Sequence, residues 1–393
     1  MIFNSWDYYL LFLIPAAVFF RLAEARVRPW VIFASGSLFF TYFSYTQFGG
    51  AIGVACLAIF LWECFVSRFY RAGSWICWLG IVQTVLFLAV FKYRNFLSGL
   101  WWPSAEANPL FWRHAFLPLG ISFFTFEFIH YAADRYNDRT EAGTAGEYLA
   151  FILFFPTMVA GPIKRYEDFL PKLRAVSREW ALDWQRGTTR ILAGLVKKFA
   201  VADVLTAYTD HLNMADISRA ERHILPLWLF AYGIKIYADF SAYSDIAIGS
   251  ARLFGIRVPE NFDWPYLRTN ITDFWRHWHM SLTNWLIDYI YIPLGGSRVK
   301  GGRVYANILV TMLVSGIWHG AGVNFIVWGL AHGVMLSVRR AWQRLRPASA
   351  RPARPVVLFL SWLLTFVCVN LAWAFFCMDV QTALFFFRRL IIG

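Results

Sequence analysis

His319 is the residue of this sequence whose type and surroundings point most clearly to chemistry. It lies in the run Ser315–Gly322, where two apolar segments meet, and glycine occupies three positions of that run. An ionisable side chain in such a region is costly to bury, so a functional role is the first hypothesis for it. Desolvation favours the neutral imidazole, which can act as a general base, and the glycines leave room for a substrate.

A second histidine motif is Phe274–Ser281, which contains His277 and His279. On a continuous helix His279 would share a face with Arg276, whereas His277 would point about 160° away from His279. The two histidines therefore cannot chelate one ion on a helix, and no third ligand has a suitable spacing. We predict that the protein has no metal site.

Further polar residues interrupt the apolar run 231–250, among them Lys235, Asp239, Tyr243 and Asp245. Charged groups at membrane depth need partners, and Lys235 precedes Asp239 by one helical turn. A structural ion pair and the wall of a polar tunnel are both open interpretations. Asp239, Tyr243 and Asp245 are therefore candidate substrate-binding residues.

The elements that must position these residues are predicted to be membrane helices. Hydrophobic residues make up 59% of the chain and charged residues 16%, too little charge to cover the surface of a soluble protein. The apolar runs lack the alternation of barrel strands, so we predict an all-α protein with about 10–12 membrane segments. The segments lie near 7–22, 29–46, 48–67, 74–92, 115–133, 146–162, 190–208, 224–254, 303–318, 321–338 and 356–378.

Two stretches differ from the others. The segment 146–162 contains Pro156, Gly161 and Pro162, which favour a re-entrant segment that lines a protein-enclosed cavity. The stretch 271–294 mixes aromatic and charged residues, and we expect an amphipathic helix at the membrane interface or inside the bundle.

The charge of the protein is strongly basic, with 37 Lys and Arg against 24 Asp and Glu, a net charge of +13. The basic residues stand between apolar segments, which indicates membrane topology and contact with anionic lipids and not nucleic-acid binding. The positive-inside rule puts three basic loops in the cytoplasm, and a role in gripping an anionic acyl donor is the alternative interpretation. These loops are 163–189, 298–303 and 339–354.

The loop placement predicts the depth of His319. If loops 298–303 and 339–354 are both cytoplasmic, the chain enters the membrane, turns at His319 and returns. From Arg303 to His319 a helix rises about 24 Å, against a hydrocarbon thickness of about 30 Å. His319 is therefore predicted to lie deep in the membrane.

The rest of the sequence indicates one membrane domain over residues 1–393. The five cysteines lie in or near apolar runs without a CxxC pattern, as expected for buried apolar side chains. The first apolar run lacks a cleavage site, so we expect a retained helix. The remaining histidines are interpreted as interface or packing residues: His114, His130, His211, His223 and His332.

Several motifs, in order along nearly the whole chain, carry a resemblance to the membrane-bound O-acyltransferase family. The chain is most similar to the bacterial branch with the alginate O-acetylation and teichoic-acid D-alanyl transfer membrane proteins. The similar segments are Phe3–Ser5, Pro118–Phe126, Phe155–Pro156, Ala160–Ile163, Tyr237–Asp245, Asn261–Phe262, Pro265–Tyr266, Phe274–Ser281, Tyr291–Gly296 and Trp318–Gly320.

The resemblance implies a funnel-shaped helical bundle of the bacterial inner membrane, with His319 as the catalytic histidine and His279 as the second motif position. His319 would act as a base on a hydroxyl or would carry the acyl group, and His279 would bind the thioester region or stabilise an oxyanion. Arg276, Asp273 and Trp318 are further candidates for contact with the donor. The implied donor is an acetyl thioester, acetyl-CoA or another acyl thioester, and no bound cofactor is expected.

The resemblance also implies partners: membrane lipids, a periplasmic acetyltransferase and polysaccharide export machinery. His277 stands where the alginate-like pattern usually has a second arginine. The chain ends at Gly393, where many such members continue, and this leaves the partner open. Two alternatives to acetyl transfer are D-alanyl transfer from a carrier protein and a transporter or flippase without chemistry, although no inverted repeat is evident.

Overall fold

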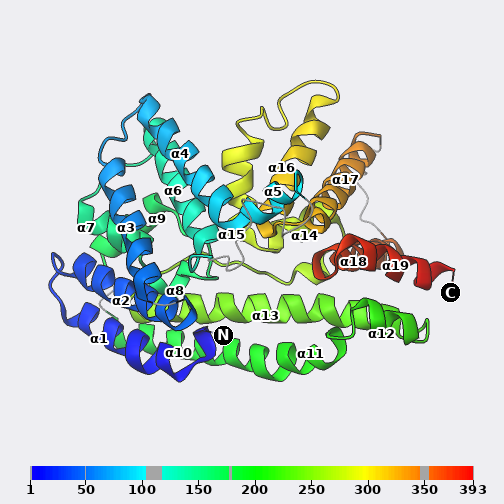
Figure 1. Ribbon diagram of the computed structural model, residues 1–393, viewed down its shortest axis with the longest axis horizontal. Coiled ribbons are helices and arrows are strands. Elements are labelled where there is room, and N and C mark those ends of the chain that lie inside the picture. The colour runs from blue at the N-terminus through cyan, green and yellow to red at the C-terminus, as the bar shows by residue number, and fades with distance from the viewer. Residues whose placement is uncertain (1, 49, 103–116, 177–178, 346–353, 393) are drawn as a thin grey trace. The chain divides into compact units, whose positions relative to one another are not determined.

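The computed structural model describes residues 2–48, 50–102, 117–176, 179–345 and 354–392 (Figure 1). Its regular elements are helices, and no β-strand occurs among the described residues. The prediction of an all-α protein is confirmed. His114 and residues 346–353 of the third basic loop lie outside the described residues, so the predictions for them have no structural counterpart.

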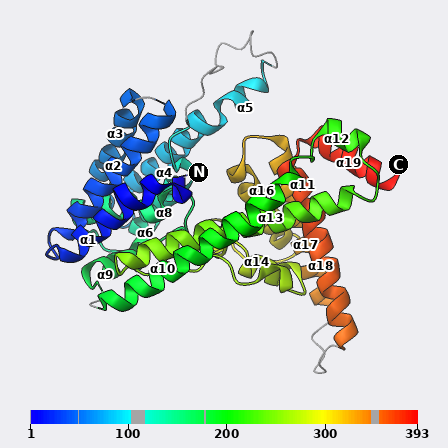
Figure 2. The same cartoon turned by 90° about the horizontal axis from the view of Figure 1, so that it is seen from below.

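The chain divides into two compact units. Unit 1 comprises Met1–Leu195 and Tyr243–Pro259, and unit 2 comprises Val196–Ala242 and Glu260–Gly393. The long helix α13 (Leu225–Leu253) is unbroken and contributes residues to both units (Figure 2). The single membrane domain expected from the sequence stays a prediction, and each unit is described by itself below.

Unit 1 holds the first ten α-helices of the chain. Its core is dominated by buried phenylalanine and tyrosine side chains, which pack edge to face, as Phe39 does on Phe12. Glycines allow close helix crossings: a Cβ on Gly187 of α10 would lie 2.8 Å from the carbonyl oxygen of Gly249 in α13. The helices are α1 (Ile14–Leu22), α2 (Arg28–Phe48), α3 (Gly50–Ser67), α4 (Trp75–Leu88), α5 (Arg94–Gly99), α6 (Ile121–Tyr136), α7 (Ala145–Ile152), α8 (Phe155–Met158), α9 (Tyr166–Arg174) and α10 (Trp180–Val196).

Unit 2 holds the C-terminal helices and both histidine motifs. Its core contains a cluster of buried tryptophans, with Trp328 stacked on Trp373 at 5.6 Å between ring centroids. The 3₁₀ turn Pro265–Leu267 leads into the first motif. The helices are α11 (Asp203–Thr209), α12 (Met214–Arg219), α14 (Ile271–His277), α15 (Met280–Leu286), α16 (Arg303–His319), α17 (Val323–Leu345), α18 (Pro355–Cys377) and α19 (Val380–Ile391).

Most predicted apolar segments coincide with helices, but 146–162 does not form one continuous helix. It contains the eight-residue α7 and the four-residue α8, separated by a break before Phe155. Two helical stretches among the described residues are long and apolar enough to cross a membrane by length and composition, Trp75–Gly99 and Pro355–Cys377. The larger number of membrane segments stays a prediction.

The prediction of one amphipathic helix over 271–294 is wrong. α14 ends at His277, Trp278 is extended, and His279 has a φ of 44° in the left-handed region before α15 begins. Backbone hydrogen bonds from the segment before α14 stabilise this break. The N–H of Asp263 donates to the carbonyl of His277, and the N–H of Met280 donates to the carbonyl of Asn261. Arg276 and His279 therefore do not share a helical face.

Candidate functional site

The hairpin of α16 and α17 positions His319. Its two helices approach closely because Gly316 and Gly329 face each other, and a Cβ on Gly316 would lie 2.3 Å from the carbonyl oxygen of Phe325. His319 is the last residue of α16, directly before the extended Gly320. This crossing brings the C-terminal end of α16 against the first turns of α17.

Aromatic rings surround the half-buried His319. Its imidazole lies 4.8 Å from the ring of Trp318, 5.0 Å from Trp328 and 5.1 Å from Phe376, measured between centroids. All three contacts are edge to face. These rings fix the orientation of the imidazole while part of it stays accessible.

His279 is held by hydrogen bonds to a neighbouring loop. Its Nδ1 lies 3.1 Å from Oδ1 of Asn261, which also accepts from the backbone N–H of Ser281 at 3.2 Å and from the Ser281 hydroxyl at 2.8 Å. Because a backbone N–H can only donate, the shared atom is the amide oxygen of Asn261. Nδ1 of His279 must therefore carry the hydrogen, and Nε2 of the neutral ring is an acceptor.

Nε2 of His279 is buried, and this acceptor is unsatisfied by the described residues. His279 is fully buried, and its Nε2 has no hydrogen-bond partner among the described residues. Burial lowers the pKa of His279 to about 3, so the ring is neutral over the physiological pH range. A buried, unsatisfied acceptor is costly and in a native protein calls for an explanation such as a ligand.

Trp318 links the two histidines. The His279 ring lies 6.1 Å from the Trp318 ring, and the Trp318 ring lies 4.8 Å from His319. The structure thus brings two predicted site residues, His279 and His319, to the indole of a third, Trp318. The sequence separates the two histidines by the whole of α15 and α16.

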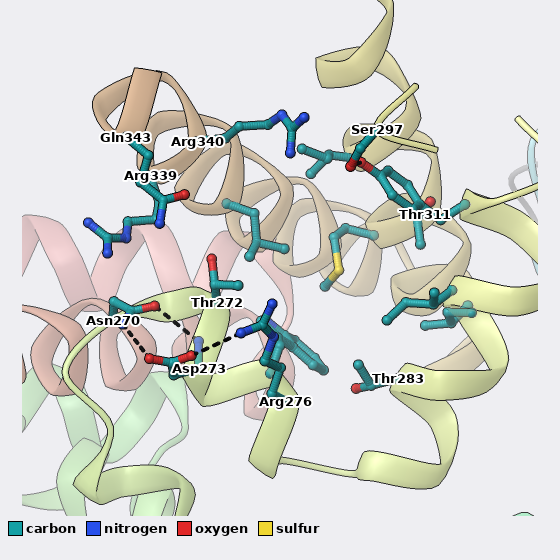
Figure 3. A pocket seen from close by; sticks show the side chains of 17 residues that line it. Asn270, Thr272, Asp273, Arg276, Thr283, Ser297, Thr311, Arg339, Arg340 and Gln343 are labelled. Atoms are coloured by element: carbon teal, nitrogen blue, oxygen red, sulfur yellow. Dashed lines mark hydrogen bonds and ion pairs between the residues drawn. The ribbon is translucent and has the colours of Figure 1, made fainter. Parts of the chain in front are cut away.

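Asp273 and Arg276 lie in a cavity of about 400 Å³ within unit 2 (Figure 3). They form an ion pair at 3.5 Å, and Asp273 also accepts from the amide of Asn270, which caps α14. Figure 3 shows Arg339 and Arg340 of α17 at the opposite wall. Neither His279 nor His319 is among the described residues that line this cavity.

One wall of the cavity leads toward His319 through two tryptophans. Trp275 lines the cavity and lies 5.9 Å from Trp328, which in turn lies 5.0 Å from His319. The indole N–H of Trp275 donates to Nδ1 of the buried His332 at 3.3 Å. Sequence analysis assigned His332 to helix packing and missed this contact, since nothing in the spacing relates it to Trp275.

The other three candidate substrate-binding residues have protein partners. Asp239 lies 2.9 Å from Lys198. The suggested pair of Asp239 with Lys235 is not formed, because Lys235 donates to the Thr209 hydroxyl at 2.8 Å. In unit 1, Asp245 accepts from the Arg190 guanidinium at 2.6 Å.

These contacts favour the structural interpretation of the two aspartates. Tyr243 also belongs to unit 1, where its ring lies 6.2 Å from Phe3. The substrate-binding roles of the three residues stay predictions. Among the described residues no group of three His, Cys, Asp or Glu side chains could hold a metal ion.

Comparison with known proteins identifies the family of the chain. The model of the membrane-bound O-acyltransferase (MBOAT) family matches residues 72–378. The chain is 35% identical over 388 residues to the probable alginate O-acetylase of Azotobacter vinelandii, a match covering 96% of this chain and 75% of that protein. It is 35% identical over 331 residues to the peptidoglycan O-acetyltransferase of Helicobacter pylori, covering 76% and 61%.

The teichoic acid D-alanyltransferase of Streptococcus thermophilus is 31% identical over 289 residues, covering 70% of this chain and 67% of that protein. The chain belongs to the membrane-bound O-acyltransferase family. It is a membrane-bound acyltransferase, and the transporter alternative is set aside because the family and its named relatives are acyl-transferring enzymes.

Proposed function

We propose that this protein moves an acetyl group from a cytoplasmic thioester, acetyl-CoA, across the membrane for O-acetylation of an exported polysaccharide. The observation that carries the proposal is the convergence of His279 and His319 on Trp318. Acyl transfer needs a base at the attacking hydroxyl and a second group that orients a reactant, and the two imidazoles can fill these two roles.

His319 is the proposed catalytic residue. It removes the proton from the acceptor hydroxyl while the oxygen attacks the thioester carbonyl, so that a C–O bond forms and the C–S bond breaks. The proton then passes to the departing thiolate, and the products are an ester and a thiol. The alternative, in which His319 itself carries the acetyl group between two such steps, uses the same side chain.

The hydrogen bonds of His279 favour one of its two expected roles. Its Nε2 is an acceptor, because Nδ1 carries the hydrogen that is donated to Asn261. An acceptor cannot stabilise an oxyanion, which requires donors. It suits an amide N–H of the pantetheine arm or an acceptor hydroxyl, so we assign His279 to binding and orienting a reactant.

The cavity beside α14 is the proposed entrance for the donor. Arg276, Arg339 and Arg340 line it, and guanidinium groups bind phosphates through paired N–H donors. Asp273 holds Arg276 at 3.5 Å and restricts its orientation. The Trp275–Trp328 wall then separates the donor's phosphates from the site of acyl transfer at His319.

The proposed placement of the donor and acceptor sides in the membrane rests on the charges of the loops. The basic loops favour a cytoplasmic donor side, and an acceptor would reach His319 from the periplasmic side of a multi-pass inner-membrane protein with a funnel-shaped bundle and a re-entrant segment at 146–162. The acetyl group would pass to a periplasmic acetyltransferase that works with the polysaccharide export machinery. Membrane lipids complete the set of proposed partners.

Similarity supports acetyl over D-alanyl as the transferred group. The alginate and peptidoglycan O-acetylating relatives are 35% identical to this chain, against 31% for the D-alanyltransferase. The first of these also covers a larger share of the chain. We therefore favour acetyl transfer and leave the acceptor as a polysaccharide of the cell envelope or exterior.

The test measures the acetyl content of exported polysaccharide in cells that carry wild type, His319→Ala or His279→Ala. The matched control is His223→Ala, whose side chain is exposed on the surface. We expect His319→Ala to lose acetylation at normal membrane abundance, His279→Ala to lose most of it, and the control to resemble wild type. Undiminished acetylation in His319→Ala would overturn the proposed mechanism.

A further inference from the structure

Unit 1 contains a second cavity, of about 610 Å³, that is separate from the proposed donor entrance. It is formed where α1 ends, α2 begins, α9 ends and α10 begins. Three arginines line it, Arg21, Arg28 and Arg174, together with Trp180 and three small or apolar residues. The acyl-transfer mechanism makes no use of this cavity.

Two of the three arginines form ion pairs with carboxylates. Arg21 is buried and donates to Asp183 at 2.8 Å, and Asp183 also accepts from Arg252 at 2.8 Å. Arg174 forms ion pairs with Glu141 and with Glu147. These guanidinium groups therefore have fixed partners and shape the walls of the cavity.

Arg28 is different. No hydrogen bond or ion pair joins its guanidinium to any described residue, and its Nε is buried without a partner. Its only described contact of this kind is with the ring of Phe20, 5.7 Å from the guanidinium carbon. An unpaired cation beside the buried Arg21 is repelled by it and loses hydration, which an anion in the cavity would offset.

The surroundings of the cavity indicate which anion. The loop 163–189 is basic, and we expect it at the cytoplasmic membrane surface. Trp180 is 38% exposed at the rim, and tryptophan is enriched at this interface. Basic pockets between membrane helices on the cytoplasmic side are typical sites for anionic lipid headgroups.

We propose that this cavity is a phosphate-binding site in which Arg28 is the principal ligand, and that it holds the headgroup of an anionic phospholipid or a free phosphate. The phosphate oxygens would accept from the guanidinium of Arg28, including the otherwise unsatisfied Nε. The lipid chains would leave the cavity at the Trp180 rim. The site is independent of the proposed acetyl transfer.

The experiment uses the full chain in phosphatidylcholine nanodiscs, with and without phosphatidylglycerol, and a parallel series with inorganic phosphate. The variants are Arg28→Gln, Arg28→Lys and the matched control Arg26→Gln. Arg26 lies two residues before Arg28, is exposed and does not line the cavity. Thermal unfolding and co-purified lipid by native mass spectrometry are the two measurements.

We expect phosphatidylglycerol to raise the Tm of wild type and Arg26→Gln, and to be retained several-fold less by Arg28→Gln. In phosphatidylcholine alone, Arg28→Gln should be at least as stable as wild type, because loss of the Arg28 charge relieves its repulsion from Arg21. A response to inorganic phosphate alone, lost in Arg28→Gln, would support the site and identify the soluble source. Equal phosphatidylglycerol retention by Arg28→Gln and Arg26→Gln, with no phosphate response, would overturn the proposal.

Discussion

The two units differ in how they treat buried polar groups. In unit 1 the buried charges are joined in pairs and networks: Arg21 with Asp183, and Lys164 with Glu127. In unit 2 the fully buried polar side chains include His279 and His332, which lie among aromatic rings, and Nε2 of His279 has no partner among the described residues. Paired charges fix a structure, whereas an open acceptor is available to a ligand.

Buried polar atoms without hydrogen-bond partners occur in both units. In unit 2, Nε2 of His332 and the hydroxyl of Ser315, which lies one turn before His319, are also buried without hydrogen-bond partners among the described residues. In unit 1 the unsatisfied Nε of Arg28 lies at a cavity, and the hydroxyl of the core residue Tyr148 is also buried without a partner among the described residues. Under the proposed function, unit 2 would carry the acyl-transfer chemistry and unit 1 would act mainly as a scaffold.

The largest expected effect tests the scaffold role of unit 1. Lys164 and Glu127 are each almost fully buried, so Lys164→Ala leaves an uncompensated carboxylate and should destabilise the protein by about 3–5 kcal/mol. The loss should appear as a lower Tm in detergent micelles and lower membrane abundance. The acetylation activity of each remaining folded molecule should be close to that of wild type.

The matched control is the double variant Lys164→Met with Glu127→Gln, which removes both charges. Replacing both members of a buried pair is often nearly neutral, so most of the stability should return. If Lys164→Ala unfolds at the wild-type temperature, the pair is not structural and the contrast between the units fails there.

The second prediction concerns the orientation of His279. Asn261→Leu removes the oxygen that accepts from Nδ1 of His279 and from Ser281, so His279 would no longer be fixed. We expect kcat/KM for acetyl transfer to fall roughly 10- to 100-fold, in the range found for the loss of a positioning contact. The rate is measured in proteoliposomes at matched protein abundance.

Asn261→Asp separates positioning from simple loss of packing. Its carboxylate still accepts from Nδ1 but favours the imidazolium, so it raises the pKa of His279 above the wild-type value of about 3. Activity should then fall as pH decreases through the raised pKa and recover at higher pH. Wild type should show no acid limb from His279 above pH ~5. Identical pH profiles would contradict the assigned tautomer.

Much of the fold could be predicted from sequence, and His319 could be singled out as a candidate site residue. Long apolar runs require helices in a membrane, and His319 is recognisable because an ionisable residue beside glycines is rare in such a run. The break at His279 could not be predicted, because it depends on Asn261, 18 residues away in the sequence. Periodicity alone favours a continuous helix there.

The tertiary partners of charged residues likewise could not be predicted from the sequence. Asp239 has a lysine one turn before it, and yet its ionic partner is Lys198, from a different helix. The local spacing of charges indicates which pairs are geometrically allowed and not which ones form. The cavity lined by Arg276 and Arg339 joins α14 to α17, elements with no relation in the linear pattern.

The smallest expected effect is that of a substitution in the wall between the proposed donor cavity and His319. Trp275→Phe keeps the aromatic contact but removes the indole N–H that donates to His332. The loss of one such hydrogen bond costs about 1 kcal/mol, or roughly a fivefold change in an equilibrium constant. Because Trp275 lines the cavity, we expect the donor KM to rise by about that factor with kcat little changed.

Trp362→Phe is the control for this change. Its indole N–H donates to the carbonyl of Tyr266 at 2.8 Å, and it does not line the cavity. Both variants should therefore lose similar stability, but only Trp275→Phe should change the donor KM, as titration with acetyl-CoA would measure. An equal rise in both variants would mean that general loosening of unit 2 weakens donor binding. A rise in Trp275→Phe alone would link the open, aromatic character of unit 2 directly to its donor site.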